Sequence, residues 1–394
     1  MPAFNLVDEL LPKELKFVSS KVFKRGYLWE VKKRRNDFEI CPRCAEKSSV
    51  QCGRVYVVVR EAPLREKPLW LRIEKHRYFC KPCRKPFTEP VAGIWPRRRT
   101  TSHFRKAVAS DCEYYTNLNL VRKHHDCSSG FIYQVHYAAL RAKLRERVET
   151  PWPKVLGIDE HFFTRRKGFA EFATVFCDLN KRRLFEMVRG KDTKSIFGLI
   201  DQYPGRENVK IVVIDLSNGY RGIVKKMFPK AQIIADKFHV LRLMTPALMK
   251  LRKQINCNKR ELKQRRLILR NREGLTYFEK FEIDKFLAKH PDLEELYLFK
   301  ERLRSFYKSR NHRQARRQLR IFIDDLGKSR QEAANTLGRT LKKWAEELIA
   351  YFGKGWTNGF TEATNGTAKA LQRRARGFKN FENYRSKTLN ACFF

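Results

Sequence analysis

Short apolar runs alternate with amphipathic stretches between residues 155 and 236, and they predict a sheet with helices on its faces. Five runs have the length and β-branched content of buried strands, and two stretches among them have helical spacing. The predicted strands are 155–159, 171–178, 183–189, 209–215 and 231–236, and the predicted helices are 193–203 and 218–228. Three neighbouring strands followed by alternating helices and strands indicate a mixed α/β sheet.

The chain before this sheet divides into a β-rich stretch and a helical stretch. Residues 1 to about 35 predict a short helix followed by a strand, and residues 38–90 contain apolar runs typical of strands, of which Val55–Val59 is the clearest. Residues 102–146 predict three helices. The turn at 126–130 gives the last two a helix-turn-helix pattern, and an ordinary helical hairpin is an equally good interpretation.

The chain after the sheet is predicted to be helical. Leucines recur at helical spacing from 240 to 352, where no run resembles a strand, and residues 360–390 form a basic helical segment that Gly377 stops. Prolines at 151 and 153 mark a boundary, because proline blocks helix continuation. The predicted parts are an N-terminal segment 1–37, a β-rich module 38–95, a helix-turn-helix domain 100–148, a catalytic domain 152–239 with its helical end 353–394, and an inserted helical block 240–352.

Composition points to a polyanionic partner. The 394-residue chain has 85 Lys+Arg against 42 Asp+Glu, a net charge of +43 and a pI of about 10.2. This excess suits binding along a DNA or RNA backbone, and an anionic membrane or ribosomal RNA is the alternative. No apolar stretch reaches the ~18 residues of a membrane span, and the first residues lack the pattern of a signal peptide. We therefore expect a reducing compartment.

Ten cysteines in a reducing compartment favour metal binding over disulfides. Four of them form two Cys-x-x-Cys pairs, Cys41/Cys44 and Cys80/Cys83, which can close on one structural Zn²⁺. A redox pair fits less well, because two pairs occur and no βαβ pattern surrounds them. The other six are interpreted as small buried hydrophobes: Cys52, Cys112, Cys127, Cys177, Cys257 and Cys392.

Three acids form the candidate catalytic site. Asp159 and Asp215 each end an apolar run, and Glu362 lies in the later helical segment. Singly, each could be a cap, a turn residue or a solvated side chain. The strand order matches an RNase H-like sheet, in which the first and fourth strands are adjacent, so Asp159 and Asp215 would meet at one rim. Three such carboxylates can hold two Mg²⁺ ions, since hard oxygen ligands suit a hard cation.

Several stretches resemble the DDE transposases of bacterial insertion sequences, specifically the ISL-three family. The resemblance spans about 40–390 and rests on Leu156-Gly157-Ile158-Asp159-Glu160, Ile214-Asp215, Ala235-Asp236-Lys237-Phe238-His239-Val240, Thr357-Asn358-Gly359 through Glu362 and Asn365, Arg373-Arg374-Ala375, and the cysteine module. It implies an RNase H-like mixed sheet with a large helical insertion, an N-terminal zinc ribbon and a helix-turn-helix. Lys237 stands where the family usually has Arg, and Thr361 and Ala363 flank the acid where Gly often follows it.

The resemblance also implies a function and its residues. Asp159, Asp215 and Glu362 would be the catalytic triad with two Mg²⁺, for which Mn²⁺ substitutes, and the chain would cleave the element ends and join their 3′-hydroxyls to target DNA. The partners would be double-stranded DNA, both terminal inverted repeats and target, and further copies of the chain in a homodimer or higher oligomer. Two alternatives stay open: an inactive DNA-binding regulator, and an RNase H-like nuclease without strand transfer.

Further residues are candidates for contact or support. DNA contacts are predicted for Lys369, Arg373 and Arg374 on the last helical segment, where a solvated basic face is the alternative. DNA contacts are also predicted for Tyr133, Gln134 and His136 in the helix-turn-helix. Asn365 is a possible supporting residue. Asp236 and His239 have a supporting or DNA-contacting interpretation and an equally good local-packing one, and Glu160 and His161 are similarly undecided.

Overall fold

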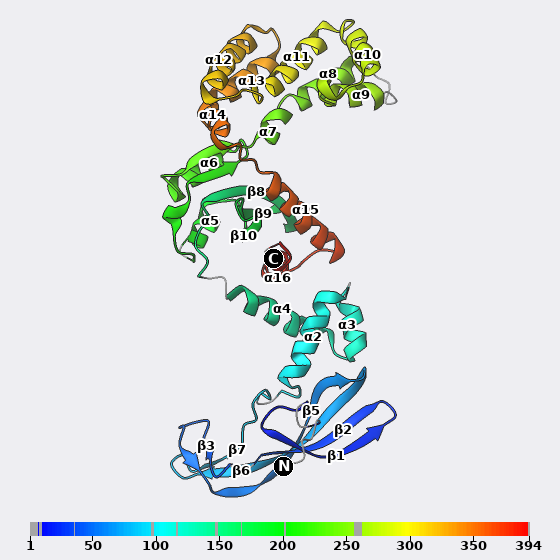
Figure 1. Ribbon diagram of the computed structural model, residues 1–394, viewed down its shortest axis with the longest axis vertical. Coiled ribbons are helices and arrows are strands. Elements are labelled where there is room, and N and C mark those ends of the chain that lie inside the picture. The colour runs from blue at the N-terminus through cyan, green and yellow to red at the C-terminus, as the bar shows by residue number, and fades with distance from the viewer. Residues whose placement is uncertain are drawn as a thin grey trace. The chain divides into compact units, whose positions relative to one another are not determined.

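The computed structural model describes residues 7, 10–34, 36–95, 98–115, 117–145, 149–166, 168–200, 202–255 and 262–392. They form two compact units, Met1–Ala142 and Lys143–Phe394 (Figure 1). Cys257 and the beginning of the predicted N-terminal helix lie outside the described residues. None of the described helices is long and apolar enough to cross a membrane.

The first unit begins with a five-stranded sheet. Its strands are β1 (Leu15–Phe23), β2 (Gly26–Lys33), β5 (Gln51–Leu64), β6 (Lys67–Cys80) and β7 (Lys85–Thr88), and a separate short ladder joins β3 (Glu39–Ile40) to β4 (Lys47–Ser48). The order is β1-β2-β6-β5, with β7 paired to β6. Alternate residues of β6, Leu69, Leu71 and Ile73, are buried in the core of this sheet. The prediction of one strand before residue 35 is therefore wrong, because two strands, β1 and β2, form a hairpin there.

Three helices complete the first unit: α2 (Ser102–Tyr114), α3 (Leu118–His125) and α4 (Ser129–Arg145), the last of which continues into the second unit. Thr101 and Asn117 begin α2 and α3 by accepting hydrogen bonds from backbone N–H groups of the first turn. Asp126, with a left-handed φ of 48°, ends α3. The helices lie where the apolar spacing predicts them, and a role of α3 and α4 as a helix-turn-helix stays a prediction.

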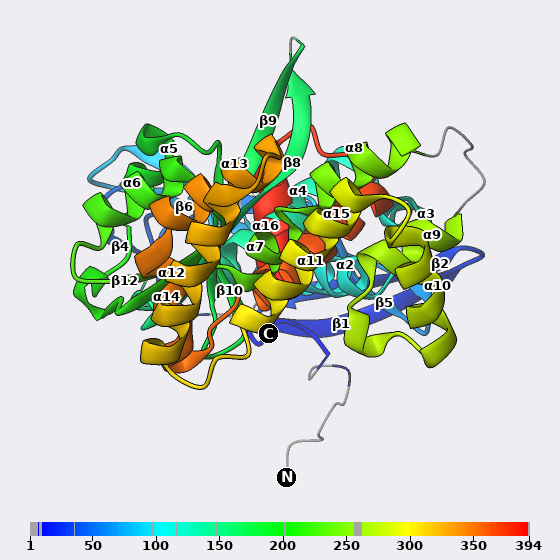
Figure 2. The same cartoon turned by 90° about the horizontal axis from the view of Figure 1, so that it is seen from above.

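The second unit contains the predicted mixed sheet. Its strands are β8 (Val155–Arg166), β9 (Phe169–Asp178), β10 (Arg183–Arg189), β11 (Ile211–Ile214) and β12 (Gln232–Ala235), in the order β10-β9-β8-β11-β12. β8, β9 and β10 are antiparallel neighbours, whereas β11 runs parallel to both β8 and β12. The first and fourth strands are thus adjacent, with Val213 paired to Gly157. Beyond that pair β8 and β9 continue as a two-stranded ribbon, which Figure 2 shows projecting from the sheet.

Both faces of this sheet are covered by helices. Val212 and Ile214 pack on one side with α5 (Thr193–Ile200) and α6 (Asn218–Met227), whereas Ile211 and Val213 pack on the other with α15 (Gly359–Arg374) and α16 (Phe381–Cys392). This alternation along one strand is the period of two that a sheet buried on both faces requires.

The insertion between β12 and α15 is helical throughout its described residues. Its helices are α7 (Lys237–Arg242), α8 (Thr245–Ile255), α9 (Leu262–Leu269), α10 (Tyr277–Leu287), α11 (Pro291–Phe306), α12 (His312–Lys328), α13 (Glu332–Lys343) and α14 (Ala345–Lys354). The absence of strands from 240 to 352 is confirmed for the described residues, and α11 begins at Pro291. Buried side chains of α11 to α14 join the core on the α6 side of the sheet, so the insertion and the sheet share one core.

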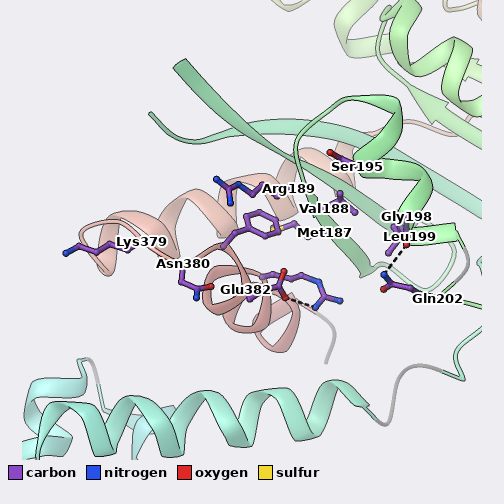
Figure 3. A pocket seen from close by; sticks show the side chains of 12 residues that line it. Met187, Val188, Arg189, Ser195, Gly198, Leu199, Gln202, Lys379, Asn380 and Glu382 are labelled. Carbon is purple, nitrogen blue, oxygen red and sulfur yellow. Dashed lines mark hydrogen bonds and ion pairs between the residues drawn. The ribbon is translucent and has the colours of Figure 1, made fainter. Parts of the chain in front are cut away.

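A cavity of about 740 Å³ opens beside β10, between α5 and α16 (Figure 3). Two of its arginines have partners within the chain: Arg189 donates to Glu171, and Arg385 donates to the buried Glu186. None of the three predicted catalytic acids lines it.

Candidate functional site

The four paired cysteines meet at one point of the first unit. The sulfurs of Cys41, Cys44, Cys80 and Cys83 lie within 4.8 Å of one another, and Cys44 Sγ is 3.5 Å from Cys80 Sγ. Backbone N–H groups of residues 43 and 44 lower the pKa of the Cys41 thiol to about 7. Four thiols that converge in this way fit a closed tetrahedral Zn²⁺ site.

The unpaired cysteines do not all behave as predicted. Cys112 and Cys177 are buried, Cys127 and Cys392 are partly buried, and Cys52 is exposed. The prediction is wrong for Cys52, because β5 shifts register against β6 between Gln51 and Gly53, and the shift leaves Cys52 without a place in the core.

Asp159 lies inside a strand and not at its end, which corrects the sequence expectation. β8 continues to Arg166 because β9 pairs with it along its whole length, whereas the pairing with β11 ends at Gly157. Asp159 follows Gly157 by two residues, and Asp215 follows the paired Val213 by two residues. The register therefore places both carboxylates at the same level, where the parallel pair stops.

Glu362 reaches this level because the start of α15 is fixed on the sheet. The side-chain amide of Asn358 donates to the Ile158 carbonyl (2.9 Å), and its backbone N–H donates to Asp236 Oδ1 (2.8 Å). A Cβ at Gly157 would lie 2.3 Å from Thr361 Oγ1, so only glycine permits this approach. Glu362 is then in the first turn of the helix.

The acids repel one another in this arrangement. Burial raises the pKa of Asp215 to about 6, and the neighbouring Glu160 and Asp159 add to the effect. Burial first and nearby acids second also raise the pKa of Asp159 and of Glu362. Asp215 Oδ1 is buried and has no hydrogen-bond partner among the described residues. A buried, unpartnered carboxylate oxygen beside other acids fits a hard divalent cation such as Mg²⁺.

Asp236 and His239 lie next to these acids. His239 Nδ1 is 3.0 Å from Asp236 Oδ2 and 3.9 Å from Glu362 Oε1, and donor atoms of the three side chains lie within 4.8 Å of one another. Burial alone would raise the pKa of Asp236, but hydrogen bonds from His239 and from the Asn358 N–H bring it below its usual value. Asp236 also accepts the His239 backbone N–H as the cap of α7. The cap agrees with the local-packing interpretation of this pair, and a supporting or DNA-contacting role stays a prediction.

A buried chain of hydrogen bonds ends on Asp159. The Asn365 amide donates to Asp159 Oδ2 (2.8 Å), its oxygen lies 2.9 Å from His161 Nδ1, and His161 Nε2 lies 2.7 Å from the Tyr384 hydroxyl. Burial lowers the pKa of His161 to about 4, so its ring is neutral. Its Nδ1–H then donates to Asn365, and its Nε2 accepts from Tyr384. Sequence patterns gave no signal for Tyr384. Asn358 stands in one of the stretches that carry the resemblance, but no role was predicted for it.

The predicted DNA contacts differ in exposure. Lys369, Arg373 and Arg374 are exposed on α15, with Lys369 two turns beyond Glu362, and Tyr133 and Gln134 are exposed on α4. His136 is only 2% exposed and packs on the ring of Tyr137, so the structure does not present it to a partner, and we remove it from the contact set.

Comparisons with known proteins give matches in both units of the chain. The ISL3 family model, described as transposase, matches residues 156–388, and a model described as the zinc-finger of transposase IS204/IS1001/IS1096/IS1165 matches residues 37–83. The chain is 24% identical over 362 residues to the transposase for insertion sequence element IS1001 of Bordetella parapertussis, covering 88% of this chain and 86% of that protein. Because the first match spans more than half of the sequence, the chain belongs to the ISL3 family of transposases.

Proposed function

We propose that the chain cleaves the ends of an insertion sequence and joins them to target DNA, with Asp159, Asp215 and Glu362 as its catalytic acids on an RNase H-like sheet. The observation that carries this proposal is the shared level of Asp159 and Asp215, which the pairing of Gly157 with Val213 sets, together with the unpartnered oxygen of Asp215. The strand order β10-β9-β8-β11-β12 supports the fold assignment.

The three acids would hold the divalent cations. When bound, two such cations would supply the positive charge that stabilises the attacking and leaving oxygens of an in-line displacement at phosphorus. In the first step a water oxygen bonds to phosphorus as the bond to the 3′-oxygen breaks, the water gives up a proton and the leaving oxygen takes one up as a 3′-hydroxyl. In the second step the oxygen of this hydroxyl loses its proton and bonds to phosphorus of a target phosphodiester, as the bond from that phosphorus to the target's own 3′-oxygen breaks and that oxygen takes up a proton.

Other residues would prepare the site for these steps. Asn365 orients Asp159 by donating to one of its oxygens, and Asn358 fixes the start of the helix that carries Glu362. Lys369, Arg373 and Arg374 extend along the same helix and would contact phosphates that flank the scissile bond.

The first unit would recognise the element ends. Four cysteines with a zinc-finger family match support a structural zinc that holds the loops of this unit. Tyr133 and Gln134 on α4 are the proposed contacts there. Assembly as a homodimer or higher oligomer on DNA, and a place in the bacterial cytoplasm on the nucleoid, belong to the same proposal.

The test is cleavage of a duplex carrying the element's own ends, with Mg²⁺ or Mn²⁺ and with EDTA, for the chain and its Glu362→Gln variant. We expect nicks at the element ends with the metal only, and none with the variant. A pre-cut donor with 3′-hydroxyl ends should then yield joined products. Metal-dependent cleavage by Glu362→Gln would contradict the triad, cleavage without joining would indicate a nuclease, and DNA binding without either reaction would indicate a regulator.

A further inference from the structure

The basic residues of the helical insertion fall into two groups with different partners. From 262 to 309, 12 Lys+Arg stand against 8 Asp+Glu, whereas from 310 to 343, 10 stand against 3. The second stretch contains α12 and α13. Local acids can therefore neutralise the first group much more completely than the second.

Basic residues of the first group form ion pairs with nearby acids. Lys263 pairs with Glu282 (2.5 Å), and both Arg266 and Arg270 pair with Glu279, the latter at 2.8 Å. These arginines and this lysine hold α9 against α10. The positive charges of Lys263, Arg266 and Arg270 are therefore balanced by carboxylates of the same chain.

A stripe of three arginines on α12 has no such partners. Arg313, Arg317 and Arg320 are exposed and recur at spacings of four and three, so they lie on one face of the helix. The buried residues Leu319 and Phe322 lie on the other side. No carboxylate pairs with the three arginines among the residues that the structure describes, and Asp324 is the acid nearest along that face.

A basic groove continues the stripe. Gly327 lies two turns beyond Arg320 on α12, and it lines a cavity of about 540 Å³ between α12 and α13. Arg330, Arg339 and Lys342 also line this groove, together with one acid, Glu332. No ion pair involves these three cations among the described residues.

We propose that this face, Arg313, Arg317, Arg320, Arg330, Arg339 and Lys342, binds the phosphate backbone of duplex DNA without reading its sequence. The stripe spans about 10 Å of helix, against which duplex DNA presents roughly six phosphate charges. Arginine suits this role, because its planar guanidinium binds phosphate oxygens in pairs. The assignment rests on the proposed function for its choice of DNA and adds a contact surface remote in sequence from the catalytic acids.

The test compares two triple variants that remove the same charge. Arg313→Gln/Arg317→Gln/Arg320→Gln removes the stripe, and Lys263→Gln/Arg266→Gln/Arg270→Gln removes three paired cations from α9. Both carry Glu362→Gln and are measured without added Mg²⁺ or Mn²⁺, so that no cleavage is involved and the zinc of the first unit is retained. Fluorescence anisotropy on a 30-bp duplex of arbitrary sequence gives the slope of log K against log[KCl].

We expect the stripe variant to lower this slope by about 0.9 for each lost phosphate contact, up to ~2.7, and the control to change it by less than ~1. Circular dichroism melting checks that both variants fold. Equal slopes for the two variants would show an effect of net charge alone and overturn the proposal. A loss seen on an RNA duplex or on phosphatidylserine vesicles, and not on DNA, would overturn it as well.

This outcome is separable from that of the cleavage test. A chain that does not cleave its element ends would still show the change in salt slope if the stripe contacts DNA. If the chain cleaves its element ends and the stripe variant leaves the salt slope unchanged, the catalytic triad is supported and the proposed DNA contact of the stripe is wrong.

Discussion

The cysteine cluster of the first unit and the acid cluster of the second are built in opposite ways. The cysteines come from two turns within 43 residues, Cys41 to Cys83, and all four sulfurs face one another. The acids come from Asp159, Asp215 and Glu362, and each has a raised pKa because burial and like charge disfavour its ionised form. The first arrangement is a closed set of four ligands, whereas the second retains an unsatisfied oxygen. A closed shell suits a structural metal, and an open one suits metal ions that must also meet a substrate.

Removing one acid gives the sharpest test of this contrast. Asp215→Asn should reduce cleavage by ~10³-fold or more, since a proposed metal ligand is lost. In EDTA at neutral pH the same variant should be more stable by on the order of 1 kcal/mol, about 2–4 °C, after discounting for partial exposure of the carboxylate. Calorimetry and a cleavage assay measure the two effects.

Asp192→Asn is the matched control. Asp192 is hydrogen-bonded to Ser195, and this bond lowers its pKa, so its loss should not stabilise the chain and should leave cleavage intact. An Asp215→Asn variant that melts lower than the parent in EDTA would contradict the picture of a strained acid.

Substitution in the cysteine cluster should lower stability, whereas removal of the Asp215 carboxylate should raise it. Cys80→Ser should abolish zinc binding and destabilise the first unit by several kcal/mol, because binding of a structural zinc is coupled to folding. Metal analysis and melting of the full chain measure this, and the Mn²⁺ affinity of the second unit should not change. Cys52→Ser, at an exposed position, is the control that keeps its zinc. Full zinc content in Cys80→Ser would exclude the four-cysteine site.

The stability and the Mn²⁺ affinity of the acid cluster should both depend on pH. The pKa of Asp215 is raised to about 6 from an ordinary 3.8, so its contribution to stability is present below 3.8 and is lost as pH rises through 6. In EDTA the second unit should therefore lose stability across this window. Protons compete with cations at the same carboxylate, so Mn²⁺ affinity should fall about tenfold per pH unit below 6. Calorimetric titration at several pH values tests this, and an affinity that does not change between pH 5 and 7 contradicts it.

The smallest expected effect concerns the far end of the hydrogen-bond chain. Tyr384→Phe removes the hydroxyl that donates to His161, and we expect a few-fold weaker Mn²⁺ binding and a stability loss of ~1–2 kcal/mol. Tyr203→Phe, which removes a hydroxyl that donates to the buried Glu186, should cost similar stability and leave Mn²⁺ binding unchanged. Identical Mn²⁺ affinities for the two variants would limit Tyr384 to a structural role.

The sequence predicts best where a structure is local. Apolar runs locate the strands of the second sheet within two residues, except for the end of β8, and the spacing of Cys41/Cys44 and Cys80/Cys83 identifies their cluster. The adjacency of β8 and β11 also follows, because the strand order matches a known topology.

Long-range pairing accounts for what the sequence missed. The apolar run before Asp159 ends there, but β9 keeps the strand extended for seven more residues. Cys52 and His136 have the residue types of a core position and a DNA contact, and tertiary packing gives each the opposite exposure. Tyr384 lies 223 residues from His161, a separation at which no local pattern carries information.

The hydrogen bond from Asn358 to the Ile158 carbonyl joins two residues that leave the ribosome at different times during synthesis. At a translation rate of roughly 5–20 residues per second, the 200 residues between them take about 10–40 s to emerge. During that interval the strand bearing Asp159 has neither the helix that carries Glu362 nor the amide that orients its carboxylate. The first unit is complete well before then, so the ribosome releases the four-cysteine module before the three acids are brought together.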